Sequence, residues 1–417
     1  MREIRELTGQ ELAQYVDISA NAYPGMKINT AEDKAHFLER VSKIAQDPGI
    51  HFYGLFADGE VQGVMRFHDF TMKLLSVKTL VGGLGGVAVD LLHKKEKIAR
   101  DMVRFFLNHY RVQGACLTAL YPFRPDFYRK MGFGYGSQMS QYSVTPGSLS
   151  HGSSKANVVP LTAVDKPGLV ACYERLLART NGLMEKQNIP LDSLFESPTT
   201  HIVGCKRDGE VRGYLLFTFR TNRADQFLDH DIIVREFVYD DREAMLELLT
   251  FLHTQADQVN RILFLTQDEH FYFLPQDPRN GTGNLLPSVW HESNTQGVGL
   301  MYRVLDVPRL FAVLAKHDFG GQTCRVRLML ADSFLPENTG EYGLGFVNGR
   351  FHPLHPTDPS DITIRLDVAE FSSLITGAIG FKQLYNYGLA DISDPAWLEP
   401  VHRLFWTENK PLCLTSF

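Results

Sequence analysis

The sequence of 417 residues has few cysteines and no long hydrophobic run. Its five cysteines are scattered, odd in number and never spaced as Cys-x-x-Cys, which argues against a disulfide framework and a structural zinc site. No apolar stretch reaches the ~18 residues of a membrane span, and the charged start MREIRELTGQEL is unlike a signal peptide. We therefore expect a cytoplasmic protein without a membrane partner. Its five cysteines are expected to be buried, unpaired thiols: Cys116, Cys172, Cys205, Cys324 and Cys413.

The sequence also lacks an excess of positive charge. Lys and Arg number 42 against 48 Asp and Glu, for a net charge of -6. This net negative charge gives no overall attraction to the phosphates of nucleic acids, so any anion site has to be local. The pair His352 and His355 has no third ligand nearby and is flanked by prolines, so we expect no metal site.

The length and composition favour a folded protein of several parts. A prior of ~150 residues per domain predicts about three domains. Hydrophobic residues make up 44% of the chain and charged residues 22%, which is enough apolar material for real cores.

An internal repeat defines two of these parts. Residues 51–71 (HFYGLFADGEVQGVMRFHDFT) align without a gap on residues 201–221 (HIVGCKRDGEVRGYLLFTFRT), with nine identical positions. Each copy has two β-rich runs around Asp-Gly, a pair that indicates a hairpin because both central positions need positive φ. Two unrelated hairpins could share this turn. Similar flanks count against that alternative, because helices are expected before the hairpins over 31–44 and 167–181.

The repeat continues downstream at the same offset of 150 residues. Val87–Asp90 aligns with Phe237–Asp240, and helices are expected to follow over about 96–109 and 242–259. Stretches rich in Pro, Gly and other helix breakers lie at 145–157 and 276–287. After the latter, the sequence predicts a strand at 301–304, a helix at 307–316 and a strand at 324–331. A hairpin at Asn348-Gly349, a strand at 362–366 and helices near 369–376 and 381–387 complete the pattern. We predict two mixed α/β units, 1–148 and 149–290, and an α+β domain, 291–417.

Residues 87–107, VAVDLLHKKEKIARDMVRFFL, are the most informative segment about function. A β run ends at Val89, a short turn holds three lysines, and an apolar helical stripe follows from Ile98. The first N–H groups of a helix are unpartnered and its dipole is positive there, so this arrangement is suited to an anion. Charge alone equally fits a solvated helix face.

A second motif, Phe127-Tyr128-Arg129-Lys130-Met131-Gly132-Phe133, follows the β run 115–120. A V-x-V strand, a basic turn and then F-Y-x-x-x-G-F resemble the GCN5-related N-acetyltransferase (GNAT) superfamily. Tandem GNAT units, a third α+β domain and a final Phe resemble the enhanced intracellular survival (Eis) acetyltransferases, whose last domain is similar to sterol carrier proteins. The resemblance implies a fold of two GNAT-like mixed-sheet units followed by a sterol-carrier-like α+β domain.

The resemblance implies an acetyl-CoA site in the first unit and no metal. Its pantetheine would pair with the strand edge at Val87, Ala88 and Val89. Its pyrophosphate would meet the turn and helix start, where Lys97 stands in place of the usual first glycine. The turn and helix-start residues are Lys94, Lys95, Glu96, Lys97, Ile98, Ala99 and Arg100, and further CoA contacts are implied at Phe123 and Arg124.

Two residues are expected to carry the reaction. Tyr128 is the expected general acid, because a phenol can protonate the departing CoA sulfur, whereas Phe127 and Phe133 are expected to pack. The resemblance brings the carboxylate of Phe417 into the same site as base or positioning group. The segment PLCLTSF lacks the charge of a solvated tail, which favours docking. In the second unit the matching turn begins Asp240-Asp241, which repels a polyanion, so we expect no CoA there.

The predicted function is transfer of acetyl from acetyl-CoA to primary amines, either aminoglycoside-type polyamines or lysine side chains. The alternative is an acyl-CoA or lipid-binding carrier without turnover, in which the third domain dominates. The family resemblance also implies a homohexamer.

Overall fold

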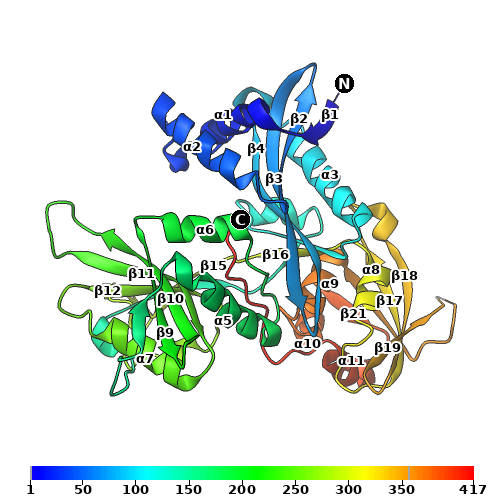
Figure 1. Ribbon diagram of the computed structural model, residues 1–417. Helices are drawn as coiled ribbons and strands as arrows, with labels where there is room; N and C mark the ends of the chain where they lie inside the picture. Colours follow the sequence, from blue (N-terminus) through cyan, green and yellow to red (C-terminus); the bar gives the residue numbers. More distant parts are fainter. Residues whose placement is uncertain (1, 356) are drawn as a thin grey trace.

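The structure, a computed structural model, describes residues 2–355 and 357–417. Three sheets organise the chain, and helices cover their faces (Figure 1). The first and second sheets each have seven strands, and the third has five. Two GNAT-type mixed-sheet units followed by an α+β domain are the predicted fold class, and the sheets confirm it.

The first sheet has the strand order β1-β2-β3-β4-β5-β16-β6. Its strands are β1 (Arg2–Glu6), β2 (Ile50–Ala57), β3 (Glu60–Leu74), β4 (Val77–Val89), β5 (Leu117–Leu120), β16 (Met301–Val304) and β6 (Gly134–Tyr135). Its helices are α1 (Leu12–Ala22), α2 (Ala31–Ile44), α3 (Ile98–Val112) and α4 (Pro125–Arg129). All neighbours are antiparallel except β4 and β5, which run parallel.

The second sheet repeats this plan in the order β15-β7-β12-β11-β10-β9-β8. Its strands are β15 (Asn294–Gly297), β7 (Met139–Val144), β12 (Arg261–Thr266), β11 (His230–Tyr239), β10 (Glu210–Thr221), β9 (Thr200–Arg207) and β8 (Val158–Pro160). Its helices are α5 (Lys166–Arg179), α6 (Asn188–Glu196) and α7 (Arg242–His253). A small exposed hairpin, β13 (Leu285–Leu286) and β14 (Trp290–His291), precedes β15.

The third sheet has the order β19-β18-β17-β20-β21. Its strands are β19 (Arg350–Leu354), β18 (Gly340–Val347), β17 (Cys324–Ala331), β20 (Ile362–Asp367) and β21 (Ala390–Ile392). The helices of this unit are α8 (Val307–Val313), α9 (Val368–Ile375), α10 (Phe381–Asn386) and α11 (Leu398–Leu404).

The two repeated hairpins turn at their Asp-Gly pairs, as predicted. Asp58 and Gly59 have φ of 51° and 88°, and Asp208 and Gly209 have φ of 51° and 82°. Positive φ at both central positions gives the twist that joins two adjacent antiparallel strands. The cysteine prediction is also confirmed, because all five thiols are buried and unpaired.

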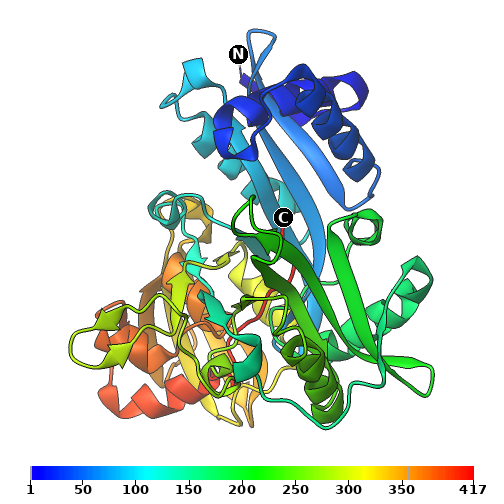
Figure 2. The same cartoon turned by 90° about the vertical axis from the view of Figure 1, so that its left-hand side faces the viewer.

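Strand pairing crosses the predicted domain boundaries at 148 and 290. Strand β7 lies in the second sheet, although it precedes residue 148, and β16 lies in the first sheet, although it follows residue 290. The first predicted unit therefore gives β7 to the second sheet, and the third predicted unit gives β16 to the first sheet. The boundaries themselves stay a prediction. Figure 2 shows the first and second units side by side, with the third unit against both.

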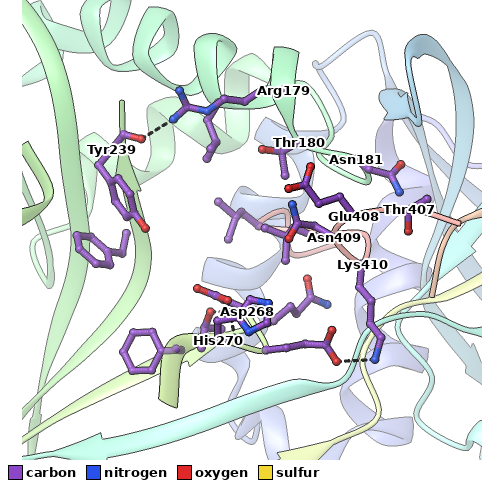
Figure 3. A pocket seen from close by; sticks show the side chains of 18 of the residues that line it. Arg179, Thr180, Asn181, Tyr239, Asp268, His270, Thr407, Glu408, Asn409 and Lys410 are labelled. Atoms are coloured by element: carbon purple, nitrogen blue, oxygen red, sulfur yellow. Dashed lines mark hydrogen bonds and ion pairs between the residues drawn. The ribbon is translucent and has the colours of Figure 1, made fainter. Parts of the chain in front are cut away.

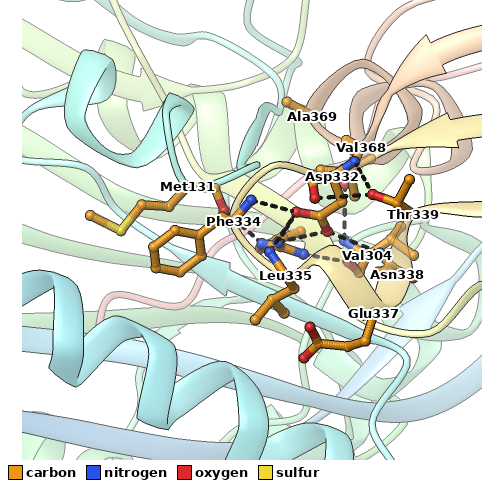
Figure 4. Close-up of polar contacts among 12 residues, drawn as sticks. Met131, Val304, Asp332, Phe334, Leu335, Glu337, Asn338, Thr339, Val368 and Ala369 are labelled. Atoms are coloured by element: carbon orange, nitrogen blue, oxygen red, sulfur yellow. Dashed lines mark hydrogen bonds and ion pairs between the residues drawn. The ribbon is translucent and has the colours of Figure 1, made fainter.

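A buried ion pair fixes β16 in the first sheet. The Arg303 guanidinium donates two 2.8 Å hydrogen bonds to Asp332, and neither side chain is exposed (Figure 4). Arg303 also donates to the carbonyl of Met131, just before β6. Removing one partner would leave a buried charge unpaired, at a cost of roughly 3–5 kcal/mol. This cluster therefore joins the first and third units.

Candidate active site

The two central parallel strands of the first unit separate part-way along. Strands β4 and β5 pair only over Val81–Leu84 and Leu117–Leu120. Strand β4 continues to Val89, whereas β5 ends at Leu120. On the side of β5, the backbone of Val87–Val89 therefore pairs with no strand of residues 2–355 and 357–417. The register of β3 on β4 also shifts between Val64 and Arg66, which marks a bulge at Gly85–Gly86. A separating parallel pair is where α/β folds place ligands.

Tyr23 lies against this strand edge, a contact that the sequence did not predict. Its hydroxyl donates a hydrogen bond to the carbonyl of Val87, and burial raises the pKa of Tyr23 to about 12. The long spacing between residues 23 and 87 gives no local signal for this contact.

The basic turn occupies residues 90–97 between β4 and α3. Lys95 and Lys97 adopt the left-handed backbone, with φ of 69° and 66°, and Lys97 is the residue that caps α3. Left-handed backbone is what glycine supplies without steric cost, so Lys97 keeps the conformation of the usual glycine and adds a charge. Among the residues that the structure describes, no side chain caps α3, and its first N–H groups are left for a ligand.

The other predicted turn residues divide into two groups. Lys94, Lys95 and Arg100 are exposed, whereas Ile98 packs inward with the apolar face of α3. Glu96 is engaged by Arg2, whose guanidinium also donates to Asp101 at 2.8 Å. Arg2 therefore brings another positive charge to the start of α3, which the sequence motif did not reveal.

Tyr128 lies on α4 and is 2% exposed. Its ring contacts Phe123, Phe127 and Phe133 edge-on, with centroids 5.2–5.8 Å away. Burial raises the pKa of Tyr128 above the usual phenol value, so the hydroxyl is protonated at neutral pH. Phe127 and Phe133 pack against Tyr128, in agreement with the sequence prediction.

Arg124 does not approach the basic turn through any hydrogen bond or ion pair in the described residues. Its guanidinium is exposed and pairs with Asp126 at 2.6 Å, two residues along the chain. The neighbouring Phe123 is 57% exposed, whereas the Tyr128 ring against which it packs is almost fully buried.

The segment from 406 onward, the C-terminal segment, returns to the first unit between the other two (Figure 1, red). Its backbone is tied down at several points. The amide of Leu412 donates to the Asn181 carbonyl at 2.8 Å, and the amide of Cys413 donates to Gln267 at 2.6 Å. The hydroxyl of Tyr121 then donates to the carbonyl of Thr415. The predicted docking of this segment is therefore seen in its contacts.

The ring of Phe417 enters an aromatic slot on the first sheet. The ring centroids of Phe70, Tyr121 and His68 lie 4.9, 5.3 and 5.5 Å from it. The slot exists because β4 carries glycines on this face. A Cβ on Gly85 would lie 3.1 Å from the carboxyl carbon of Phe417. Phe417 thus lies against the bulge at which β4 leaves β5.

Two polar side chains on β3 share this face. Arg66, His68 and Phe70 alternate along the strand, so all three point the same way. A Cβ on Gly85 would also lie 3.3 Å from the Arg66 guanidinium. Within the described chain, Nε of Arg66 and Nε2 of His68 are buried without a hydrogen-bond partner. A buried polar atom without a hydrogen bond destabilises the fold, so native proteins have few of them. Such atoms are typical of functional sites.

The second unit orients His68. Nδ1 of His68 lies 3.0 Å from Oε1 of Gln187, whose Nε2 donates to the carbonyl of Gly49 at 3.1 Å. The hydrogen bond to Gly49 fixes which end of the Gln187 amide is the oxygen, and this oxygen faces His68. Nδ1 of His68 therefore carries the proton, and Nε2 is unprotonated with a free lone pair. Burial and the charge of Arg66 lower the pKa of His68 to about 3, so the ring is neutral.

Residues 182–185, which precede Gln187, lie beside β3 like an extra strand. The carbonyl of Leu183 accepts from the amide of Lys73 at 2.8 Å, and the amide of Glu185 donates to the carbonyl of Thr71 at 2.9 Å. The first unit's site is therefore built partly by the second unit.

Comparisons with known proteins agree with this geometry. Residues 3–136 and 176–304 each match an acetyltransferase (GNAT) domain family, and residues 310–414 match the sterol carrier protein domain family. The chain is a GNAT acetyltransferase. Its two GNAT domains and sterol carrier domain form an Eis-like architecture, as the sequence motifs predicted. The GNAT domains indicate an acetyl-CoA-dependent acyltransferase.

Solved structures share this fold over the whole chain. A GCN5-related N-acetyltransferase from Anabaena variabilis is 16% identical with a TM-score of 0.82, and one from Kribbella flavida is 18% identical with a TM-score of 0.78. Eis1 from Mycobacterium abscessus is 19% identical with a TM-score of 0.74. Each comparison covers 100% of both chains. Among curated proteins no match was found.

Two further features are absent from the described part of this GNAT chain. No group of three or more His, Cys, Asp or Glu side chains is arranged to hold a metal ion in residues 2–355 and 357–417. In the same residues, no helix is both long and apolar enough to cross a membrane.

Proposed function

We propose that this GNAT enzyme transfers acetyl from acetyl-CoA to a primary amine by direct attack, in the first unit. Acetyl-CoA supplies the activated acyl group. The edge at Val87–Val89 and the basic turn would hold its pantetheine and pyrophosphate, as backbone groups and lysines of this chain can. The observation that carries the proposal is the aromatic slot, which holds Phe417 against the bulge where β4 leaves β5.

The amine nitrogen attacks the thioester carbon, the C–S bond breaks, and CoA leaves as the thiol. Tyr128 is the proposed proton donor to the sulfur. Because burial makes Tyr128 a weaker acid than a free phenol, its contribution begins as a hydrogen bond to the charge developing on sulfur.

The Phe417 carboxylate is the proposed positioning group for the amine. A terminal carboxyl has an ordinary pKa of about 3.5, so it attracts an ammonium more readily than it deprotonates one. The proton lost by the amine passes through water toward this carboxylate. The Arg66 guanidinium lies on the same side of Gly85 as the Phe417 carboxyl group, since a Cβ on Gly85 would lie 3.3 Å from Arg66 and 3.1 Å from the carboxyl carbon. Its positive charge therefore attracts the carboxylate.

The substrate class follows from this chemistry. A carboxylate at the site favours cationic acceptors, so aminoglycoside-type polyamines and lysine side chains are the proposed substrates. The predicted homohexamer also stays a proposal, which light scattering of the purified protein tests directly.

Release of CoA thiol with a panel of amines tests the function. Kanamycin, spermidine and a lysine peptide should each be compared with buffer alone, and amine-dependent release supports the enzyme. Binding of acetyl-CoA without release from any amine would instead support the carrier alternative, which the GNAT matches do not favour.

A glycine added after Phe417 tests the carboxylate. It moves the charge by one residue while leaving the ring in its slot. We expect acetyl transfer to fall with acetyl-CoA binding unchanged, and full activity would remove the carboxylate from the mechanism.

A further inference from the structure

The second unit contains a cavity of about 830 Å³ where its own central strands separate (Figure 3). Strands β11 and β12 run parallel only over Asp231–Val234 and Arg261–Phe264. Past that point lies what we call the second-unit cavity, walled by the end of β11, the loop 266–274 and the C-terminal segment at 406–414. The cavity thus occupies the position that corresponds to the cofactor cleft of the first unit.

The polar end of this cavity is closed to a nucleotide cofactor. Arg179 donates hydrogen bonds to the backbone carbonyls of Tyr239 and Asp240, at 2.8 and 3.3 Å, so the strand edge is already paired. Asp241 caps α7 by accepting from the amide of Ala244 at 2.9 Å. A carboxylate therefore occupies the helix end that a phosphate would need.

The walls of the cavity combine aromatic rings with acidic groups. Within the described residues, neither Asp268 nor Glu408 forms an ion pair, whereas Glu269 pairs with Lys410 at 2.5 Å and Arg179 is committed to backbone carbonyls. The charge of Asp268 contributes, after burial, to the raised pKa of Tyr239. The aromatic side chains on the walls are Phe237, Tyr239, Phe264, Phe271, Phe273 and Trp406.

We propose that the second-unit cavity binds an organic cation, an ammonium group on an apolar body. The ammonium would lie near Asp268 and Glu408, which both line the cavity (Figure 3), and the body would lie against the rings. Aromatic faces attract cations, and the cavity has the volume of an ordinary small-molecule site. This site is separate from the acetyl-transfer site and does not depend on the proposed function.

Equilibrium dialysis of the full chain with phenethyltrimethylammonium tests the site. A quaternary ammonium has no N–H to acetylate, so the probe is never a substrate. We expect saturable binding of this probe, and binding weaker by roughly tenfold or more for 3-phenylpropane-1-sulfonate, which has the same ring and the opposite charge. Equal binding of the two molecules would overturn the proposal.

The double variant Asp268→Asn with Glu408→Gln locates the probe. It should lose affinity for phenethyltrimethylammonium by roughly tenfold while binding acetyl-CoA like the parent. The matched control is Asp225→Asn with Glu341→Gln, which removes two exposed carboxylates far from the cavity lining and should leave the affinity unchanged. Unchanged affinity in the Asp268 and Glu408 variant would show that the probe binds elsewhere. Acetyl-CoA binding separates this result from a failure of the acetyltransferase proposal.

Discussion

The two GNAT units share a hairpin and a separating parallel pair but differ in the connection from the strand to the next helix. The first unit connects β4 to α3 through residues 90–97, with lysines in left-handed backbone. The second unit connects β11 to α7 through residues 240–241, and both carboxylates are held by arginines. A backbone plan can thus be duplicated while a connection suited to an anion is present in one copy only, because that suitability depends on connection length and charge.

A second difference lies within the strands themselves. At the offset of 150 residues, Val81–Val89 reads VGGLGGVAV and 231–239 reads DIIVREFVY. The glycines of the first unit make room for side chains from other elements, and the second unit fills the same positions with its own. A Cβ on Gly82 would lie 2.4 Å from the Tyr110 ring, and one on Gly86 would lie 2.2 Å from the Tyr15 hydroxyl.

The largest effect is expected from Tyr128→Phe, which removes the buried hydroxyl of α4 in the first unit. We expect turnover to fall by about 10² or more, with acetyl-CoA affinity nearly unchanged. Steady-state kinetics measure the turnover, and titration with acetyl-CoA measures the affinity. Tyr387→Phe, an exposed tyrosine in the third unit, is the matched control. Unaltered turnover in Tyr128→Phe would remove the residue from the mechanism.

Gly83→Ala should destabilise the first unit by about 1–3 kcal/mol, because its new Cβ would lie 2.4 Å from the Phe70 ring. Guanidinium denaturation measures the change. Gly147→Ala serves as control, since a Cβ there meets no atom within 4 Å. Equal stability of the two variants would mean that Phe70 moves freely, and that the glycines of β4 are not needed for packing.

His68 should make the enzyme less stable in acid. The pKa of His68 is about 3 in the folded protein, below the ordinary value of 6.5. Between these two pH values, His68 binds a proton in the unfolded chain but not in the native protein. The free energy of unfolding should therefore fall by up to ~1.4 kcal/mol per pH unit as pH drops from 6.5 toward 3.

His68→Phe should flatten that pH dependence, although it is less stable at pH 7 because Gln187 loses its donor. Denaturation at pH 7 and pH 5 compares the slopes. His36→Phe, at an exposed position, should keep the parent's slope. A parent-like slope in His68→Phe would show that His68 is hydrated in solution.

The smallest effect is expected from changing Lys94, Lys95 and Lys97 together to Gln. Exposed charges near a helix start contribute about 0.3–1 kcal/mol each, so acetyl-CoA should bind roughly tenfold more weakly, with turnover at saturation unchanged. Calorimetric titration with acetyl-CoA at low and high salt measures this loss of affinity. In the second unit, Asp241→Lys should create no CoA binding, because Arg179 still occupies the strand edge.

Local elements were predictable from the sequence where periodicity and turn chemistry agree. The helix 31–44 and the strands 301–304 and 324–331 have the predicted bounds. The helix predicted from 96 begins at Ile98, because Lys95 and Lys97 take a left-handed backbone that no helix accepts. The helix predicted to reach 259 ends at His253, after which the chain forms turns.

The tertiary part of the site was not predictable in this way. The exchange of β7 and β16 between sheets and the contact of Gln187 with His68 join residues more than a hundred positions apart. Alternating polar and apolar residues predict that a strand has one buried face, but they do not predict which sheet the strand joins. Tyr23 belongs to no motif. Arg66 lies within the repeat 51–71, but it is not one of the identical positions, and its place beside Gly85 follows only from the pairing of β3 with β4.

The insertion of β16 sets the order of events on the ribosome. The first sheet needs Met301–Val304 between β5 and β6, yet β6 is made more than 160 residues earlier. At ~5–20 residues per second, the nascent first unit waits on the order of ten seconds or longer with an open sheet edge. Open edges invite pairing with other chains, so the newborn protein is most exposed to aggregation through β5 during this interval.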